Sequence, residues 1–412
     1  MKFLFDDESF SFETLRAAGY ANAGGADLGE LLVTARAIPE GDEAAWHREW
    51  KATAQRVEAL GRQSLAAGRA VSAREAMLRA SNYYRTAEFY LRENPAHDPE
   101  AKELFARSRE TFLDAMPLFD FGFERIAIPY QDTALPGYLY LADDSGRPRP
   151  TVIFNGGYDS TLEESYVALA AGALARGYNV LAFDGPGQGA ALREQGLTFR
   201  PDWEAVLTPV VDFALTRPEI APDAIALFGY SLGGYLAARA AAFETRLAAV
   251  ILNDGVYDFY GALAGMMPPF LIDWIDQGND EAADAVIGLL MAVNTQTRWA
   301  VRNGLWALGI DTIPDLARAF KAYTIADVAA KITTPTLVLD AENDQFFKGQ
   351  PEQAAAAMVN AKTTLVTLHE ADGAGEHCHM GAASRANQVM FDWLDAELHR
   401  AVAPGEQIAG GL

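Results

Sequence analysis

The five residues Gly229-Tyr230-Ser231-Leu232-Gly233 constrain the fold of this 412-residue chain more than any other stretch. They follow an apolar run, residues 224–228, and they precede an alanine-rich segment that ends near Phe243. This order predicts a strand, a sharp turn and a helix. In a G-x-S-x-G turn the glycines let the backbone pass close to its neighbours, and the serine hydroxyl stands exposed as a nucleophile. The alternative is an ordinary turn with a surface serine, because the motif consists of common residues.

Apolar runs alternate with helical patterns on both sides of this motif. Two segments with period-two alternation, residues 123–128 and 137–141, predict an antiparallel pair of strands. Continuous apolar strands separated by helices predict a mostly parallel sheet with both faces covered, which is an α/β fold. The further predicted strands are 151–154, 180–183, 225–228, 249–252, 336–339 and 364–368, and the predicted helices are 162–176, 201–216, 232–243, 350–359 and 383–399.

Two regions do not follow this alternation. Residues 1–122 show helical periods, over 43–60, 70–90 and 98–116, and predict an N-terminal helical cap segment. Residues 254–331 are also helical and rich in Met, Trp and Phe, and they separate core segments 123–253 and 332–412. We expect this insertion to form a lid over the carboxyl edge of the sheet, where ligands bind in open α/β folds. Ordinary packing helices would have the same composition.

A serine nucleophile needs a base, and the base needs an orienting acid. An acid is expected after a late strand. The loop that follows residues 336–339 offers Asp340, Glu342 and Asp344. Asp344 is the predicted acid because it lies past the strand end, where the loop can turn toward Ser231.

The base is expected after the last strand, in residues 369–379, which contain three of the six histidines. His377 is the predicted base, His379 is the second candidate, and His369 lies too close to the strand end. Cys378 could itself be a nucleophile, but it has no elbow of its own. A metal site at residues 376–379 would need further ligands that the sequence does not supply, so no metal is predicted.

The oxyanion hole of such a site combines the amide after the nucleophile with one from the loop after an early strand. These positions are Leu232 and Tyr158, the latter in the glycine-containing loop 155–160. The candidate substrate-binding residues are Tyr230, Tyr84, Trp299 and Asp258. For each aromatic residue, a place in a hydrophobic core is the alternative.

Composition excludes several classes of function. A net charge of −23 argues against nucleic acid and anionic membranes as partners. A single cysteine excludes an internal disulfide, and no apolar run reaches the roughly 20 residues of a membrane span. The first residues lack an apolar leader, so we expect a cytoplasmic protein. It would act on a small molecule without a cofactor, and exposed helical faces would allow a homodimer.

In chain order, four segments resemble the α/β-hydrolase superfamily, in the branch of 2,6-dihydroxypseudooxynicotine hydrolase and the fungal polyketide-shortening pigment hydrolases. The segments are residues 156–165, 183–189, 229–234 and 375–379. The resemblance spans nearly the whole chain and includes the helical N-terminus. It implies an α/β-hydrolase fold with Ser231 as nucleophile, Asp344 as acid and His377 as base.

The same resemblance implies hydrolysis of a carbon–carbon bond next to a ketone, in an aromatic or polyketide-like substrate. Hydrolysis of an ester, thioester or amide, or acyl transfer and cyclisation, would use the same triad. A non-catalytic binding protein of this fold is a third hypothesis, which the ordered Ser, Asp and His disfavour. One relative uses an extra lid acid. Here Asp254, Asp258 and Asp273 lie in the lid region, and no motif selects among them.

Overall fold

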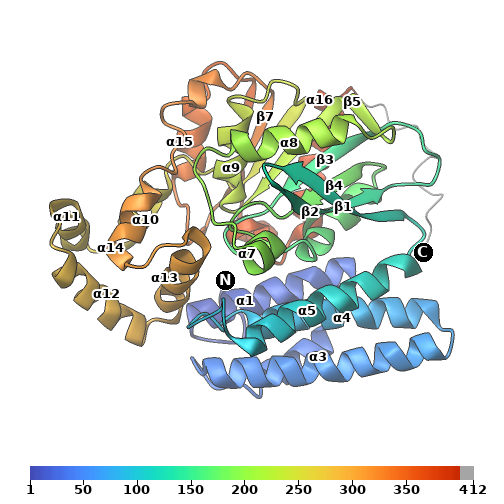
Figure 1. Cartoon of the computed structure of the whole chain (residues 1–412), viewed down its shortest axis with the longest axis horizontal. Helices are drawn as coiled ribbons and strands as arrows, with labels where there is room; N and C mark the ends of the chain where they lie inside the picture. Colours follow the sequence, from blue (N-terminus) through green and yellow to red (C-terminus); the bar gives the residue numbers. More distant parts are fainter. Residues whose placement is uncertain (400–412) are drawn as a thin grey trace.

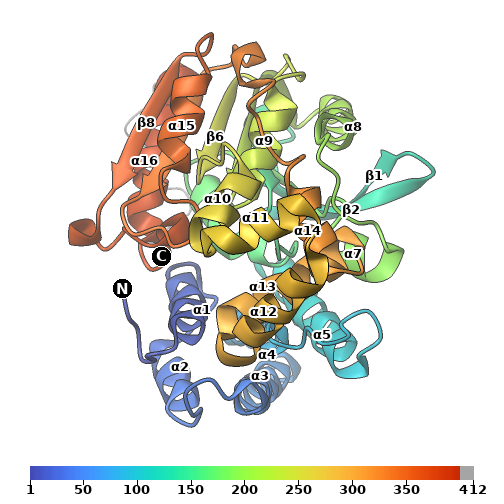
Figure 2. The same ribbon diagram turned by 90° about the vertical axis from the view of Figure 1, so that its left-hand side faces the viewer.

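A single eight-stranded sheet forms the centre of the computed structural model, which describes residues 1–399 (Figures 1 and 2). The strand order is β1-β2-β4-β3-β5-β6-β7-β8. β1 pairs antiparallel with β2, and β2 with β4, while every other pairing is parallel. The strands are β1 Gly122–Tyr130, β2 Thr133–Leu141, β3 Arg149–Asn155, β4 Asn179–Phe183, β5 Ile220–Tyr230, β6 Ala249–Asn253, β7 Thr336–Ala341 and β8 Thr363–Leu368.

Each predicted strand coincides with one of these eight. β4, β6 and β7 are buried at every residue, as expected of central strands covered on both faces, whereas β1 alternates between buried and exposed residues over most of its length. Together with the mostly parallel pairing, this confirms the predicted α/β fold with a mostly parallel sheet.

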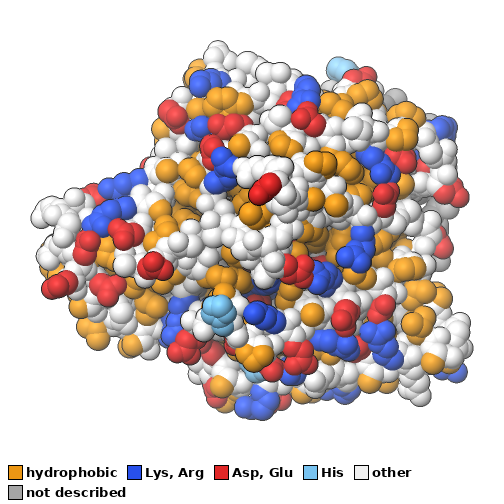
Figure 3. Space-filling model, in the orientation of Figure 1, with side chains coloured by type: hydrophobic (Ala, Val, Ile, Leu, Met, Phe, Trp, Pro, Cys, Tyr) orange, Lys and Arg blue, Asp and Glu red, His pale blue; other side chains and the backbone are white. Residues whose placement is uncertain are grey.

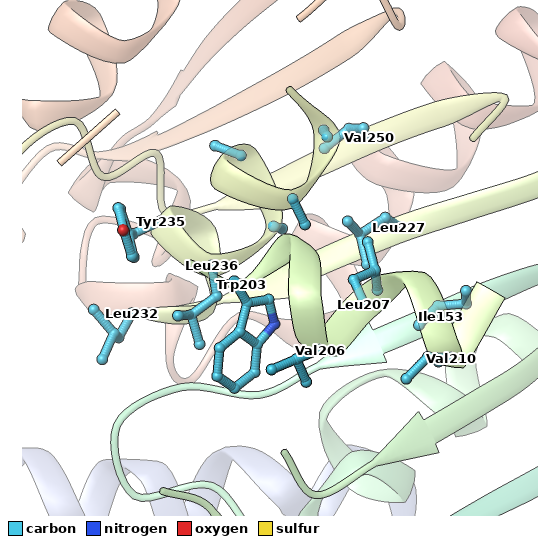
Figure 4. Packing of buried hydrophobic residues seen from close by; sticks show 14 of the residues in the cluster. Ile153, Trp203, Val206, Leu207, Val210, Leu227, Leu232, Tyr235, Leu236 and Val250 are labelled. Carbon is cyan, nitrogen blue, oxygen red and sulfur yellow. The ribbon is translucent and has the colours of Figure 1, made fainter. Parts of the chain in front are cut away.

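Helices cover both faces of the sheet. The helices of the core are α6 Ala171–Leu174, α7 Gly189–Gln195, α8 Glu204–Leu215, α9 Gly233–Ala241, α15 Gln350–Ala357 and α16 Ala383–Glu397. Figure 4 shows Trp203 and Leu207 packed with Leu236 against the sheet residues Ile153 and Leu227. Full burial of one such side chain contributes about 2 kcal/mol, so this layer fixes α8 and α9 against the strands.

The helix predicted over 162–176 differs from the structure. A π-helical turn, Tyr166–Ala170, precedes the short α6, and residues 162–163 form a turn instead. Ser165 contributes to that turn because its hydroxyl donates to the Leu162 carbonyl. α7 was not predicted, since its seven residues are too few for a clear period.

The N-terminal helices form a layer of their own beside the sheet (Figure 1). They are α1 Glu8–Gly19, α2 Leu28–Ala35, α3 Glu43–Ala66, α4 Ala70–Glu88 and α5 Pro99–Ala115. Asp42 and Asp98 cap α3 and α5 by accepting backbone N–H bonds, and Pro99 stands at the first position of α5. A separate core that includes Trp46, Trp50 and Tyr84 holds the layer together.

Between β6 and β7 the chain leaves the sheet and forms α10 Phe259–Met266, α11 Pro269–Gln277, α12 Asp280–Val293, α13 Thr295–Leu308 and α14 Ile313–Phe320. Figure 2 shows this insertion beside the N-terminal layer. Side chains join the two: Thr295 donates to Asp7 at 2.8 Å, and Arg298 donates to Glu43 at 2.6 Å. The insertion therefore bridges the sheet and the N-terminal helices.

Acidic and basic side chains are interspersed over the face drawn in Figure 3, with no large area of a single sign. None of the helices in residues 1–399 combines the length and hydrophobicity that a membrane crossing requires.

Candidate active site

Ser231 occupies a sharp turn between β5 and α9. Its φ of 59° lies in the left-handed region, which non-glycine residues adopt only when the surrounding structure imposes it. Its neighbours allow the turn because they lack side chains: a Cβ at Gly229 would lie 2.2 Å from the Gly233 carbonyl oxygen, and one at Gly233 would lie 2.4 Å from that of Asn155. The predicted elbow geometry is therefore present around Ser231.

The loops after β7 and β8 bring an acid and a base to this serine. His377 Nε2 lies 2.9 Å from Ser231 Oγ, and His377 Nδ1 lies 2.8 Å from Asp344 Oδ2. Asp344 Oδ1 accepts backbone N–H bonds from Phe346 and Phe347 at 2.7 and 2.9 Å, which fixes the carboxylate. With the ring hydrogen on Nδ1, Nε2 is free to accept the serine proton.

Burial and charge shift the pKa values of this pair in opposite directions. Burial of Asp344 favours its neutral form, but the His377 imidazole and the Phe346 amide outweigh burial and hold the pKa of Asp344 below its usual value. Burial disfavours the imidazolium, yet the Asp344 charge outweighs it and raises the pKa of His377 well above its ordinary value. The arrangement stabilises an imidazolium beside an ionised acid.

A second carboxylate lies at the same imidazole nitrogen. Asp254 directly follows β6, and its Oδ2 lies 2.8 Å from His377 Nδ1. The Cys378 amide donates to this oxygen at 3.2 Å, and Asp254 is fully buried. Burial and the Asp344 charge raise the pKa of Asp254 to about 7. The sequence placed Asp254 among three lid acids, whereas the structure places it against the base.

Asp254, His377 and Cys378 also form a group whose ligand atoms lie within 4.8 Å of one another. Burial raises the pKa of the Cys378 thiol to about 12, so the thiol is protonated. His377 is engaged by Ser231 and Asp344. A metal would have to displace these bonds, so the donor set does not favour a metal centre.

The loop after β3 approaches the elbow closely. A Cβ at Gly157 would lie 2.7 Å from the Tyr230 carbonyl oxygen and 2.9 Å from Ser231 Cβ. Gln188 donates to the carbonyls of Gly156 and Gly157, at 2.6 and 3.1 Å, and holds the loop there. Within residues 1–399 the amides of Leu232 and Tyr158 donate no hydrogen bond, which leaves both free for an oxyanion.

Ser231 and His377 open onto a cavity of about 530 Å³ between the sheet, α1 and the insertion. One wall is polar and contains Glu13 and Arg16 of α1 together with Glu164. The part of the lining that comes from the insertion is mostly apolar, with Phe259, Leu263, Met266, Leu290, Val301 and Leu316. A volume of this size suits a small organic molecule with distinct polar and apolar ends.

The predicted substrate-binding residues fall into two groups. Tyr230 and Trp299 line the cavity, and the Trp299 ring stacks on Phe89 with 4.4 Å between centroids. Tyr84 instead lies in the N-terminal core, where its hydroxyl donates to Glu58 at 2.7 Å. Asp258 caps α10 by accepting from the Gly261 amide and is not part of the cavity wall. The structure therefore does not place Tyr84 or Asp258 in the cavity, and neither is kept as a candidate substrate-binding residue.

The polar wall was not predicted. Arg16 donates through Nε and Nη2 to Glu164, both at 2.7 Å, and through Nη1 to Asp159 at 2.8 Å. The hydroxyl of Tyr20 also donates to Glu164. The only sequence signal was the spacing of Glu13 and Arg16, three residues apart in a helix, because such residues are rarely buried unless they are paired.

The sequence model of the alpha/beta hydrolase family matches residues 151–391, more than half of the chain. The chain belongs to the alpha/beta hydrolase family. This hydrolase is 37% identical to the hydrolase LUC6 of Fusarium sp, over 95% of this chain and 97% of the relative. It is 36% identical to the 20-hydroxy-prefusarin hydrolase FUS2 of Gibberella moniliformis, with the same shares covered.

Among solved structures, 2,6-dihydroxy-pseudo-oxynicotine hydrolase superposes with a TM-score of 0.73 at 25% identity, over 92% of this chain and 96% of that one. AbyA5 superposes with a TM-score of 0.64 at 16% identity and shares the fold. Since both alignments cover most of the chain, the likeness includes the N-terminal layer and the insertion as well as the sheet.

Proposed function

We propose that this chain is a serine hydrolase that cleaves a carbon–carbon bond next to a ketone, with Ser231, His377 and Asp344 as its triad. The observation that carries the proposal is the continuous hydrogen-bond chain from Ser231 Oγ through both ring nitrogens to Asp344 Oδ2, with Ser231 and His377 in the lining of a cavity. Ser231 attacks the ketone carbon while His377 takes its proton. The amides of Leu232 and Tyr158 hold the resulting oxyanion, each contributing about 3 kcal/mol.

Collapse of this intermediate breaks the carbon–carbon bond and leaves an acyl group on Ser231. The leaving carbon takes the bonding electrons as an enolate and receives the proton from the His377 imidazolium. Water then attacks the acyl-enzyme, with His377 again as base, and releases a carboxylic acid. The leaving group must be an enolate because an unstabilised carbanion is too basic to depart, so a β-dicarbonyl or related substrate fits this site.

The shape of the cavity supports an elongated, polyketide-like or aromatic substrate. Oxygen substituents would lie against Glu13 and Arg16, and the hydrocarbon part against the insertion, which acts as a lid. Burial raises the pKa of Glu13, and its Oε2 accepts no hydrogen bond within the described residues, so it can pair with a substrate hydroxyl. The name of FUS2, a hydrolase of 20-hydroxy-prefusarin, supports a hydroxylated natural-product substrate.

An ester, thioester or amide hydrolase would use the same triad and is the second candidate. A panel of β-diketones and p-nitrophenyl esters of equal acyl length separates the two. The proposal predicts kcat/KM at least about tenfold higher on the diketone, with a carboxylic acid and a ketone as products. Faster ester turnover and no diketone cleavage would make this an esterase. Ser231→Ala should abolish both activities.

A further inference from the structure

Two buried carboxylates share one imidazole nitrogen at this site. Oδ2 of Asp254 and Oδ2 of Asp344 each lie 2.8 Å from His377 Nδ1, and both side chains have no exposed surface. Among residues 1–399 neither forms an ion pair with a Lys or Arg. In the form that accepts the serine proton, the imidazole is neutral and has one hydrogen, at Nδ1. Two adjacent buried negative charges would then face a single N–H, which like-charge repulsion and desolvation strongly disfavour.

A proton shared between the two carboxylates removes this conflict, and their environments decide which one holds it. Asp344 Oδ1 accepts two backbone N–H bonds, at 2.7 and 2.9 Å, which stabilise its negative charge. Asp254 accepts one backbone bond, at 3.2 Å from Cys378, and its Oδ1 is buried with no partner within the described residues. The charge is therefore more stable on Asp344 and the proton on Asp254.

We infer that Asp254 is a positioning residue that keeps a proton. Through this proton it donates a hydrogen bond to Asp344, and it holds the His377 loop in place. This inference rests on the proposed triad and adds a fourth member to it. The neutral carboxyl lets Asp344 remain the single negative charge that orients His377. Its bond from the Cys378 amide ties the residue after the base to the end of β6.

The groups that face Asp254 come from two loops. Asp344 lies on the loop after β7, and His377 and Cys378 lie on the loop after β8. Burial keeps the Cys378 thiol protonated, so it adds no charge. Asp344 and His377 are therefore the neighbours that set the ionisation of Asp254.

The test compares Asp254→Asn with Asp344→Asn and with Asp254→Ala. Asparagine resembles the protonated acid, because its amide can donate to Asp344 and its oxygen can accept from Cys378. We expect Asp254→Asn to lose about tenfold or less in kcat, and Asp344→Asn about 10⁴-fold. Asp254→Ala should lose more kcat than Asp254→Asn with little change in KM. Equal losses in the two asparagine variants would overturn the inference.

The acid limb of the pH profile of kcat/KM is a second readout. A residue with a merely structural role would not shift it. If Asp254 is already neutral while His377 titrates, Asp254→Asn shifts the limb by less than about half a pH unit. Loss of an ionised neighbour would shift it down by about one unit or more. A shift of that size would contradict the inference.

Infrared difference spectroscopy on the free protein detects the proton without any catalysis. The wild type should show a carbonyl stretch of a protonated carboxylic acid that Asp254→Asn lacks, over a pH range that extends to about 7. Burial also raises the pKa values of Glu13, Glu163 and Asp184, so their bands appear in both proteins and cancel in the difference. Asp258→Asn, the same change four residues away at a helix cap outside the cavity, is the matched control and should retain the band. Identical protonated-carboxyl bands in the wild type and in Asp254→Asn would overturn the inference even if Ser231 is the nucleophile.

Discussion

Arg16 in the first helix donates two hydrogen bonds of 2.7 Å to Glu164, which lies 148 residues later in the chain. This contact fixes α1 against the segment after β3, from which the predicted oxyanion amide of Tyr158 also comes. The N-terminal layer is thereby part of the cavity wall. Its position relative to the sheet depends on a buried, charged network.

Arg16→Ala should destabilise the fold by about 3 kcal/mol or more, because it leaves the buried Glu164 and the half-buried Asp159 without their cation. Denaturant unfolding measures this change, and kcat/KM should fall with it. Arg48→Ala is the control: the side chain of Arg48 is 62% exposed and, among residues 1–399, pairs only with its neighbour Glu49, so its loss should stay within about 0.5 kcal/mol. Similar losses in the two variants would mean that the Arg16 network does not hold the layer.

Gly157→Ala should reduce kcat by about 10²-fold or more. The new Cβ would lie 2.7 Å from the Tyr230 carbonyl and 2.9 Å from Ser231 Cβ, so the loop must move away from the elbow. The oxyanion amide of Tyr158 would move with it. Gly265→Ala on α10 is the matched control, since nothing lies within 4 Å of its added methyl group. Wild-type kcat in Gly157→Ala would exclude this loop from the oxyanion hole.

The acid limb of the kcat/KM profile should report His377, because only the neutral imidazole accepts the serine proton. Activity is therefore present above the pKa of His377 and is lost as the pH falls through it. The Asp344 charge raises this pKa. Asp344→Asn should move the acid limb to lower pH while the plateau falls about 10⁴-fold. An unchanged limb would mean that Asp344 does not face the titrating base.

His379 should make the fold acid-sensitive. Burial lowers its pKa to about 4, and its Nε2 has no hydrogen-bond partner within the described residues. The unfolded chain binds this proton near pH 6.5 and the folded chain only near 4, so the free energy of unfolding falls as the pH decreases between these values. The full effect is about 3 kcal/mol at 1.4 kcal/mol per pH unit. A His379→Gln variant should show a flatter dependence, and an identical slope would contradict this account.

The eight strands were predictable because each is a short apolar run bounded by polar turns, and the order of the strands fixes which loops meet at the carboxyl edge. This placed Ser231, Asp344 and His377 on loops at the same edge of the sheet without any knowledge of distances. The same reasoning could not assign Tyr84, since a helical period shows that a face is buried but not whether a core or a cavity covers it.

The contacts that were missed join distant parts of the chain. Arg16 meets Glu164 only because the N-terminal layer packs beside the sheet, and no local pattern encodes that packing. Asp254 directly follows β6, as Asp344 follows β7 after a few residues, so the strand order could have placed it near His377. The helical pattern of residues 254–331 instead assigned Asp254 to the insertion, together with Asp258 and Asp273.

The most direct test of the triad is covalent labelling with a fluorophosphonate probe followed by peptide mass spectrometry. We predict one adduct per chain, on Ser231, with loss of activity in proportion to labelling. Labelling should slow by orders of magnitude in His377→Gln and be absent in Ser231→Ala. An unlabelled Ser231 in a folded, wild-type chain, or full activity in Ser231→Ala, would contradict the account.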